Sequence, residues 1–165
     1  MISILFDTET TGLIKPSAQE IDAQPYITEI FCLKVEHDMQ NFKVIDELES
    51  FVKPPVPITP EITKITGISD ATVSDAPSFA KLYNELAFFF VGASRVVAHN
   101  LAFDRAMLAN ELLRIDKLLY FPFPPQHVCT VQKSMHYEQR RLNLTKLHEY
   151  LFAAGFPNAH RARGD

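Results

Sequence analysis

The sequence has 165 residues, a formal net charge of −4 and a hydrophobic fraction of 47%. This length supports one domain with a sizeable core, and the negative charge argues against a general polyanion binder, because non-specific affinity for nucleic acid depends on neutralising phosphates. The longest apolar run, LAFFFVGA, is far shorter than the roughly 20 residues that span a membrane, and the start MISILFDTE lacks the basic region and cleavage site of a signal peptide. The two cysteines form neither a CxxC pair nor a disulfide framework. We therefore expect a cytoplasmic protein with reduced thiols.

The first part of the chain predicts three strands. Residues 2–6 are apolar enough for a buried strand, and the polar, proline-containing residues 14–25 indicate a loop. Two β-rich runs follow, residues 27–36 and 41–54, with a polar HDMQ turn between them. Such a short polar turn favours antiparallel pairing of the two runs.

Capping signals and apolar spacing predict two helices in the middle of the chain. Thr59 can cap a short helix that has Pro60 at its first position and Gly67 just past its end. Downstream, SFAKLYNELAFFF has the spacing of an amphipathic helix, and its phenylalanines favour core packing over a partner surface. The apolar positions of this helix are Phe79, Leu82, Leu86, Phe89 and Phe90.

The last part of the chain alternates strand and helix. Residues 95–98 predict a short strand, and LAFDRAMLANELLRI resumes helical spacing with Asn100 as its candidate N-cap. A proline-rich connector, FPFPPQH, leads to two further helical stretches, TVQKSMHYEQR and LTKLHEYLFAAG. This order fits an α/β domain with a mixed sheet. Residues 133–165 are also locally basic, with six Lys or Arg against three acids, which suits either a bound nucleic-acid strand or a solvated surface.

Acidic residues follow the predicted strands. Asp7 and Glu9 are two residues apart, so on a strand their side chains point to the same face. Asp104 falls in the first helical turn after RVVA, at the strand end where α/β proteins commonly hold sites. Asp165 follows His160 by five residues, a spacing that turns two side chains apart on one continuous helix. We therefore expect the histidine on a loop and the final aspartate at the start of a following helix.

These residue types point to phosphoryl-transfer chemistry. Four carboxylates from separate elements repel one another unless cations lie between them. Two divalent ions balance them with an all-oxygen ligand set, which Mg²⁺ and Mn²⁺ prefer, and such a pair can clamp the attacking and leaving oxygens of a phosphodiester. An imidazole beside them, that of His160, can deprotonate the water nucleophile. Taken singly, each acid also fits an ordinary solvated turn, and His99 fits either a substrate contact or a buried, hydrogen-bonded histidine.

The stretches FDTETTGL, ITGIS, VVAHNLAFD and HRARGD resemble the motifs of the DnaQ-like 3′→5′ exonucleases of the DEDDh type, most closely the proofreading epsilon subunit of DNA polymerase III and its stand-alone relatives. The resemblance covers nearly the whole chain. It implies a ribonuclease H-like fold, in which helices flank a five-stranded mixed sheet. It also makes Asp7, Glu9, Asp104 and Asp165 the metal-binding acids, with Asp7 bridging two Mg²⁺ or Mn²⁺ ions, and His160 the general base.

The resemblance further implies a substrate and its contacts. Thr10, Thr11, Gly12 and Leu13 match the stretch that holds the terminal nucleotide, and Asn100 matches a position near the bound strand. Residues 1–165 are then one exonuclease domain that releases 5′-nucleoside monophosphates from the 3′ end of single-stranded DNA, in proofreading or repair, with a DNA polymerase as candidate partner.

Two alternatives stay open: an RNA or oligoribonucleotide 3′-exonuclease of the same fold, and a non-catalytic module that serves a polymerase. In the family, more helix follows the last aspartate, so we expect that helix to be missing from this sequence.

Overall fold

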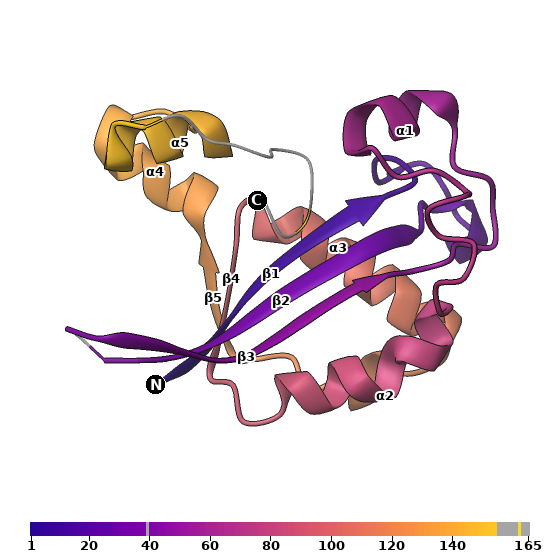
Figure 1. Ribbon diagram of the computed structural model, residues 1–165, viewed down its shortest axis with the longest axis horizontal. Coiled ribbons are helices and arrows are strands. Elements are labelled where there is room, and N and C mark those ends of the chain that lie inside the picture. The colour runs from indigo at the N-terminus through magenta and orange to yellow at the C-terminus, as the bar shows by residue number, and fades with distance from the viewer. Residues whose placement is uncertain (39, 155–161, 163–165) are drawn as a thin grey trace.

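The computed structural model describes residues 1–38, 40–154 and 162 (Figure 1). One mixed sheet forms its centre, with the strand order β3-β2-β1-β4-β5. The first three strands pair antiparallel, whereas β4 and β5 run parallel to β1. The predicted α/β class and five-stranded mixed sheet are therefore confirmed. The strands are β1 (Ile2–Thr10), β2 (Ile27–His37), β3 (Phe42–Phe51), β4 (Arg95–Ala98) and β5 (Gln126–Cys129).

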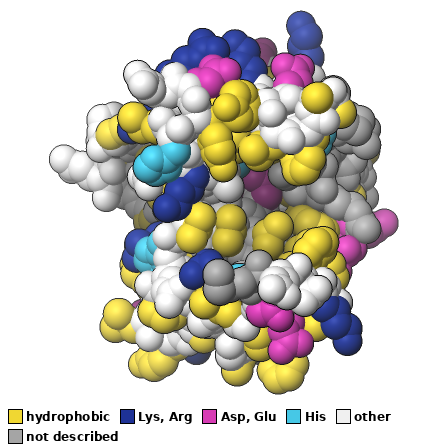
Figure 2. Space-filling view, turned by 90° about the vertical axis from the view of Figure 1, so that its left-hand side faces the viewer, with side chains coloured by type: hydrophobic (Ala, Val, Ile, Leu, Met, Phe, Trp, Pro, Cys, Tyr) yellow, Lys and Arg dark blue, Asp and Glu magenta, His cyan; other side chains and the backbone are white. Residues whose placement is uncertain are grey.

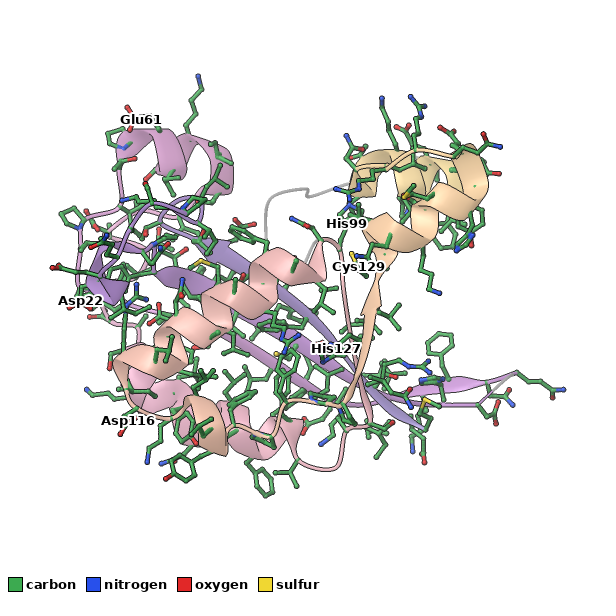
Figure 3. All side chains as sticks on the ribbon, turned by 180° about the vertical axis from the view of Figure 1, so that it is seen from behind. Asp22, Glu61, His99, Asp116, His127 and Cys129 are labelled. Atoms are coloured by element: carbon green, nitrogen blue, oxygen red, sulfur yellow. The ribbon has the colours of Figure 1, made fainter. Side chains whose placement is uncertain are left out.

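Helices lie mainly on one side of the sheet and at one end. In Figures 1 and 3, α3 crosses one face of the sheet, α2 lies along the same side, and α4 and α5 stack beyond the end of β5. The helices are α1 (Pro60–Thr66), α2 (Phe79–Phe90), α3 (Leu101–Arg114), α4 (Thr130–Glu138) and α5 (Leu144–Phe152), with 3₁₀ turns η1 (Ile21–Ala23) and η2 (Leu118–Tyr120). No helix in the described part of the chain is long and apolar enough to cross a membrane.

The main core lies between the sheet and α2 and α3. Phe90 is fully buried there, with its ring centroid 5.9 Å from that of Phe6 and 4.9 Å from that of Phe121. On β1, Ile4 and Phe6 belong to this core, whereas Leu5 between them is 40% exposed on the other face. The strand therefore alternates between a covered and an open face, as the two-residue period of a strand requires.

Local signals predicted α1 and α2 correctly. The Thr59 side chain accepts a hydrogen bond from the Ile62 amide at 3.4 Å, Pro60 opens α1, and Gly67 follows it with a φ of 74°. A positive φ at this position favours glycine, because it has no Cβ to clash. All five apolar positions predicted for α2 are buried. The unpredicted Phe88 points outward and is 80% exposed.

Two predictions were wrong in detail, and a third, the N-cap at Asn100, is confirmed in position only. The first strand continues to Thr10 rather than ending at residue 6, because its pairing with β2 continues through Glu9. Strand β5 begins inside the predicted connector, at Gln126, and pairs in parallel with β4. Asn100 lies at the N-cap position of α3, but its side chain makes no capping hydrogen bond. Its backbone is left-handed, with a φ of 67°, where a residue cannot present its side chain in the usual capping geometry.

Both cysteines are free thiols, as expected. Cys32 is fully buried in the core. Burial raises the pKa of its thiol well above the usual value, and the negative charge of Asp7 raises it further. The Cys32 thiol is therefore protonated and unreactive as a nucleophile.

Candidate active site

The open face of the sheet carries the first two predicted acids. Asp7 and Glu9 lie on β1, each half-buried, directly opposite Phe31 and Glu29 of β2. Asp7 borders a pocket of about 260 Å³ whose lining includes Leu5, Leu33, Val97, His99 and Ala162. The pocket puts a carboxylate at the edge of an apolar hollow beside the end of β4.

The third predicted acid reaches β1 from α3. Asp104 lies in the first turn of that helix and is 2% exposed. Its Oδ1 atom accepts hydrogen bonds from the Thr8 amide at 3.1 Å and the Thr8 hydroxyl at 2.8 Å. Because β4 ends at Ala98 while β1 continues, this carboxylate takes the place of a strand partner for the Thr8 amide. The helix N-terminus also favours its negative charge.

Thr8 thereby brings the three acids to one part of the sheet, since it lies between Asp7 and Glu9 in the chain. Their oxygen donors suit Mg²⁺ or Mn²⁺. Within the described residues, however, no three His, Cys, Asp or Glu side chains are placed to hold one ion. The remaining predicted members of the site, His160 and Asp165, lie outside the described residues. The donor chemistry thus fits a divalent cation, and the ligand set stays a prediction.

The loop after β1 is held by its own hydrogen bonds. The Thr10 hydroxyl donates to the Gly12 carbonyl at 2.8 Å. Two hydrogen bonds join Thr11 to Tyr26. The Thr11 amide donates to the Tyr26 carbonyl, and the Thr11 hydroxyl accepts from the Tyr26 amide. Leu13 is 79% exposed beyond them. This fixed loop with a projecting leucine is compatible with the predicted nucleotide contact, as is the exposed Asn100 at the end of β4.

His99 is a hydrogen-bonded, half-buried side chain. Its Nδ1 atom lies 2.8 Å from the Thr130 hydroxyl, at the first residue of α4. Figure 3 shows His99 beside Cys129, where β4 and β5 end and α4 begins. Burial lowers the pKa of the His99 imidazole, so the ring is neutral near pH 7. The sequence left two roles open for His99, a substrate contact and a buried, hydrogen-bonded side chain. The contact with Thr130 supports the second role, and the ring also borders the pocket.

Sequence reasoning missed Glu29, a second glutamate on the open face. It is 1% exposed, lies directly opposite Glu9, and accepts a hydrogen bond from the Ala162 amide at 3.0 Å. An acid inside the apolar run ITEIFCL was the available signal, since a charged residue is almost never fully buried without a partner.

The sequence also did not reveal the clamp that fixes the loop before β2. Glu111 of α3 accepts a hydrogen bond from the Ile27 amide at 2.9 Å and lies 3.2 Å from the Arg114 guanidinium. Arg114 in turn donates to three loop carbonyls and lies 3.7 Å over the Tyr26 ring. Burial raises the pKa of Glu111, against the opposing effects of these partners. The loop that supports Thr11 is thereby tied to α3.

A basic surface borders the open face. Figure 2 shows Lys and Arg side chains gathered at the top of the face it presents, where α4 and α5 lie, and hydrophobic side chains across its middle. The aromatic rings of Tyr137 and Tyr150 pack 5.3 Å apart in the same helix pair, each 49% exposed. We call this the α4–α5 basic surface; its exposed cations are Lys133, Arg140, Arg141 and Lys146.

Comparisons with known proteins agree with this architecture. The RNase_T family of exonucleases matches residues 4–165. A PolC-type DNA polymerase III from Caldanaerobacter subterraneus is 35% identical over 112 residues, which are 68% of this chain and 7% of that protein. The chain spans only 6% to 24% of the length of the first curated relatives that it matches.

Two solved structures share the fold. The nuclease domain of 3′hExo, a DEDDh family member bound to rAMP, has a TM-score of 0.71 at 14% identity, covering 94% of this chain and 80% of that one. The zinc-bound complex of E. coli ExoI with single-stranded DNA has a TM-score of 0.74 at 16% identity, covering 99% and 38%. These likenesses confirm the ribonuclease H-like exonuclease fold. The chain belongs to the RNase T/DnaQ-like exonuclease family, related to the exonuclease domains of PolC and epsilon-like proteins.

Proposed function

We propose that this domain is a metal-dependent 3′→5′ exonuclease that removes 5′-nucleoside monophosphates from single-stranded DNA. The observation that carries the proposal is the bond between Asp104 and Thr8, which joins the acid of α3 to the strand that bears Asp7 and Glu9. A site that needs acids from both α3 and β1 requires a contact that holds the two elements together, and the bonds between Asp104 and Thr8 provide one. Membership of the exonuclease family supports the same reaction.

The residues divide into ligands, base and substrate contacts. Asp7, Glu9, Asp104 and Asp165 would hold two divalent ions, Mg²⁺ or Mn²⁺, which when bound neutralise the acids and polarise the scissile phosphate. His160 takes one proton of the attacking water while the water oxygen bonds to phosphorus. The bond from phosphorus to the 3′ oxygen breaks, and its electron pair stays on that oxygen, which takes up a proton to give the new 3′ hydroxyl. Thr10, Thr11, Gly12 and Leu13 hold the terminal nucleotide, and Asn100 lies near the strand.

The α4–α5 basic surface supports a single-stranded substrate. Lys133, Arg141 and Lys146 can neutralise backbone phosphates, whereas Arg140 is paired with Glu138, and exposed tyrosines offer stacking faces to bases of any sequence. The similar ExoI structure was solved with single-stranded DNA. The similar 3′hExo structure holds rAMP, which keeps an RNA substrate as the second candidate. Similarity to PolC-type polymerases favours a role in proofreading beside a polymerase.

The test is degradation of 5′-labelled single-stranded DNA and a matched RNA by the full-length protein, with Mg²⁺, with Mn²⁺ and with a chelator. We expect a chelator-sensitive ladder that shortens from the 3′ end, and a faster rate on DNA than on RNA. A faster rate on RNA would show that RNA, not DNA, is the preferred substrate. No cleavage of either strand with either ion, from protein shown to be folded, would favour the non-catalytic module.

A further inference from the structure

The loop between β1 and β2, residues 11–26, is closed by two sets of hydrogen bonds. At its base, the Thr11 amide donates to the Tyr26 carbonyl at 2.8 Å, and the Thr11 hydroxyl accepts from the Tyr26 amide at 2.9 Å. Farther out, the Gln24 side chain accepts from the Lys15 amide at 3.0 Å and donates to the Lys15 carbonyl at 2.7 Å. These bonds join the outgoing limb of the loop, which precedes η1, to the returning limb, which begins with η1.

Arg114, in the last turn of α3, holds the returning limb. Its Nη2 atom donates to the carbonyls of Ile21, Gln24 and Pro25 at 2.9 Å, 2.8 Å and 3.0 Å. The guanidinium carbon lies 3.7 Å from the centroid of the Tyr26 ring. A planar guanidinium can donate to several acceptors while it stacks on a ring, which a lysine ammonium cannot do. Bonds from a charged donor are also stronger than neutral ones, and this side chain is largely buried from competing water.

The outgoing limb carries most of the residues proposed to contact the terminal nucleotide. Thr11, Gly12 and Leu13 belong to it, and the Thr10 hydroxyl donates to the Gly12 carbonyl at its start. Leu13 is exposed, so its side chain cannot fix the limb by packing. Ile14 packs against the main core but is only partly buried. The outgoing limb therefore depends on its hydrogen bonds to the returning limb, and through that limb on α3.

The same helix also holds an acid of the proposed site. Asp104, in its first turn, bonds to Thr8 of β1, whereas Arg114, in its last turn, holds the loop that follows β1. Residues 104 and 114 are ten positions apart, which is about 15 Å along a helix. A helix of this length is stiff, because each turn is hydrogen-bonded to the next. The two ends of α3 thus set where the loop lies relative to the acids.

We propose that Arg114 is a positioning residue that, by holding the returning limb to α3, pre-organises the outgoing limb for the terminal nucleotide. A loop that is already ordered loses less conformational entropy when the nucleotide binds, so affinity is higher. The consequence for the nucleotide rests on the proposed exonuclease function, whereas the ordering of the loop does not. A purely structural role makes a different prediction: loss of Arg114 would leave fewer folded molecules, but each would bind nucleotide as the wild type does.

The first experiment measures hydrogen exchange of the Thr11 amide by NMR, at a temperature where every variant is folded. This amide is expected to be protected in the wild type and to exchange at least about tenfold faster in Arg114→Leu, because the returning limb loses its contacts with α3. Arg114→Lys keeps the charge but not the stacked fork, and about threefold faster exchange is expected. Equal protection of Thr11 in the wild type and in Arg114→Leu would overturn the proposal.

Asp22→Ala is the matched control. The Asp22 carboxylate, labelled in Figure 3, is 80% exposed and lies 3.9 Å from the Arg114 Nε atom. Its removal leaves the three carbonyl bonds and the ring contact in place, so protection of Thr11 should match the wild type. Should Arg114→Leu fail to fold, Arg114→Lys still places a cation beside Glu111 and carries the decision, and equal protection in that variant would then overturn the proposal.

The second experiment measures affinity for thymidine 5′-monophosphate with Mg²⁺, followed through the Gly12 amide, and kcat and KM on single-stranded DNA. Arg114→Leu is expected to raise the nucleotide Kd and the KM about tenfold and Arg114→Lys about threefold. In both, kcat per folded molecule should stay within about threefold, because a loss of binding shared by ground state and transition state appears in KM. Asp22→Ala should leave all three quantities within about twofold of wild type.

Two outcomes separate the failures. If the Arg114 variants lower only the folded fraction, with Kd and KM unchanged, the role is structural and the proposal is wrong. If the wild type neither binds the nucleotide nor cleaves DNA or RNA, the proposed function fails and the nucleotide role of Arg114 fails with it. Exchange of the Thr11 amide still decides, in that case, whether Arg114 orders the loop.

Discussion

The two faces of the sheet differ in what covers them, although the same strands form both. Along β1, Ile4 and Phe6 pack under α2 and α3 in the main core, while Leu5, Asp7 and Glu9 point to the open side. The core on the covered face is mainly apolar, and the open face holds acids beside a pocket. Because alternate residues of a strand serve opposite faces, one short sequence can supply both the core and the site.

The difference implies that stability and activity can be damaged separately. Substitutions on the covered face remove buried apolar contacts and so lower stability. Substitutions of the acids on the open face remove negative charge without removing core contacts. Thr8 is the exception, because it points to the covered side yet bonds to Asp104. Variants of the two faces, and of this link, therefore test the division directly.

The largest effect is expected for Asp7→Ala on the open face. It should lower the cleavage rate by about 10⁴-fold, because several kcal/mol of transition-state stabilisation depend on cation binding. The melting temperature should change little, since no core contact is lost. Rate assays and thermal melts check both statements, and Asp46→Ala, an exposed acid on edge strand β3, is the control. If Asp7→Ala cleaves at the wild-type rate, the assignment of Asp7 to the site is wrong.

On the covered face, Phe90→Ala should do the reverse. Phe90 is fully buried and lies against the rings of Phe6 and Phe121, so its truncation leaves a cavity that costs about 3–4 kcal/mol of unfolding free energy. The rate per folded molecule should stay within about threefold of wild type. Urea unfolding measures the stability, and Phe88→Ala, at a side chain 80% exposed on the same helix, is the matched control. A large loss of rate in the folded variant would break the division between faces.

Local chemistry explains which features were predictable. The cap at Thr59, the turn at Gly67 and the apolar face of α2 are set by neighbours in the sequence, so they could be predicted. The strands β1 and β5 were predicted too short or not at all, because their ends are set by pairing with β2 and β4. A four-residue strand such as QHVC has too few positions to show a period.

The site divides in the same way. The two-residue spacing correctly predicted that Asp7 and Glu9 share one face of β1, and Asp104 was correctly expected in the first turn of its helix, whereas their role as metal ligands stays a prediction. Glu29 could not be predicted, because its partner is the Ala162 amide 133 residues away. Long-range contacts of this kind leave only a weak mark in one sequence, an acid in an apolar strand.

A smaller effect is expected for Thr8→Val, which tests the link between the faces. It removes the hydroxyl that donates to Asp104 but leaves the backbone amide bond. Loss of one hydrogen bond to a buried charged group should cost about 1–3 kcal/mol of stability and, by loosening the carboxylate, lower kcat about tenfold. Thr8→Ser keeps the hydroxyl, so its stability and its kcat should both be close to those of the wild type. Equal kcat for all three proteins would show that the Thr8 amide alone orients Asp104.

The smallest effect concerns Glu111, on the covered side, which binds the start of β2. Burial raises the pKa of its carboxyl above the usual value near 4.5, so the folded state binds this proton more tightly than the unfolded state does. The unfolding free energy contributed by Glu111 is therefore greatest at low pH and falls as the pH rises through and above that value. Glu111→Gln keeps an acceptor for the Ile27 amide but cannot ionise.

The difference in unfolding free energy between Glu111→Gln and wild type should consequently shift in favour of the variant between pH 4 and pH 8. Urea unfolding at each pH measures this shift, with Asp46→Asn as an exposed acid for comparison. A difference that does not change with pH would mean that Arg114, 3.2 Å away, fully offsets the burial of the charge. The clamp would then be a balanced ion pair rather than a strained one, and the covered face would tolerate charge as well as the open face does.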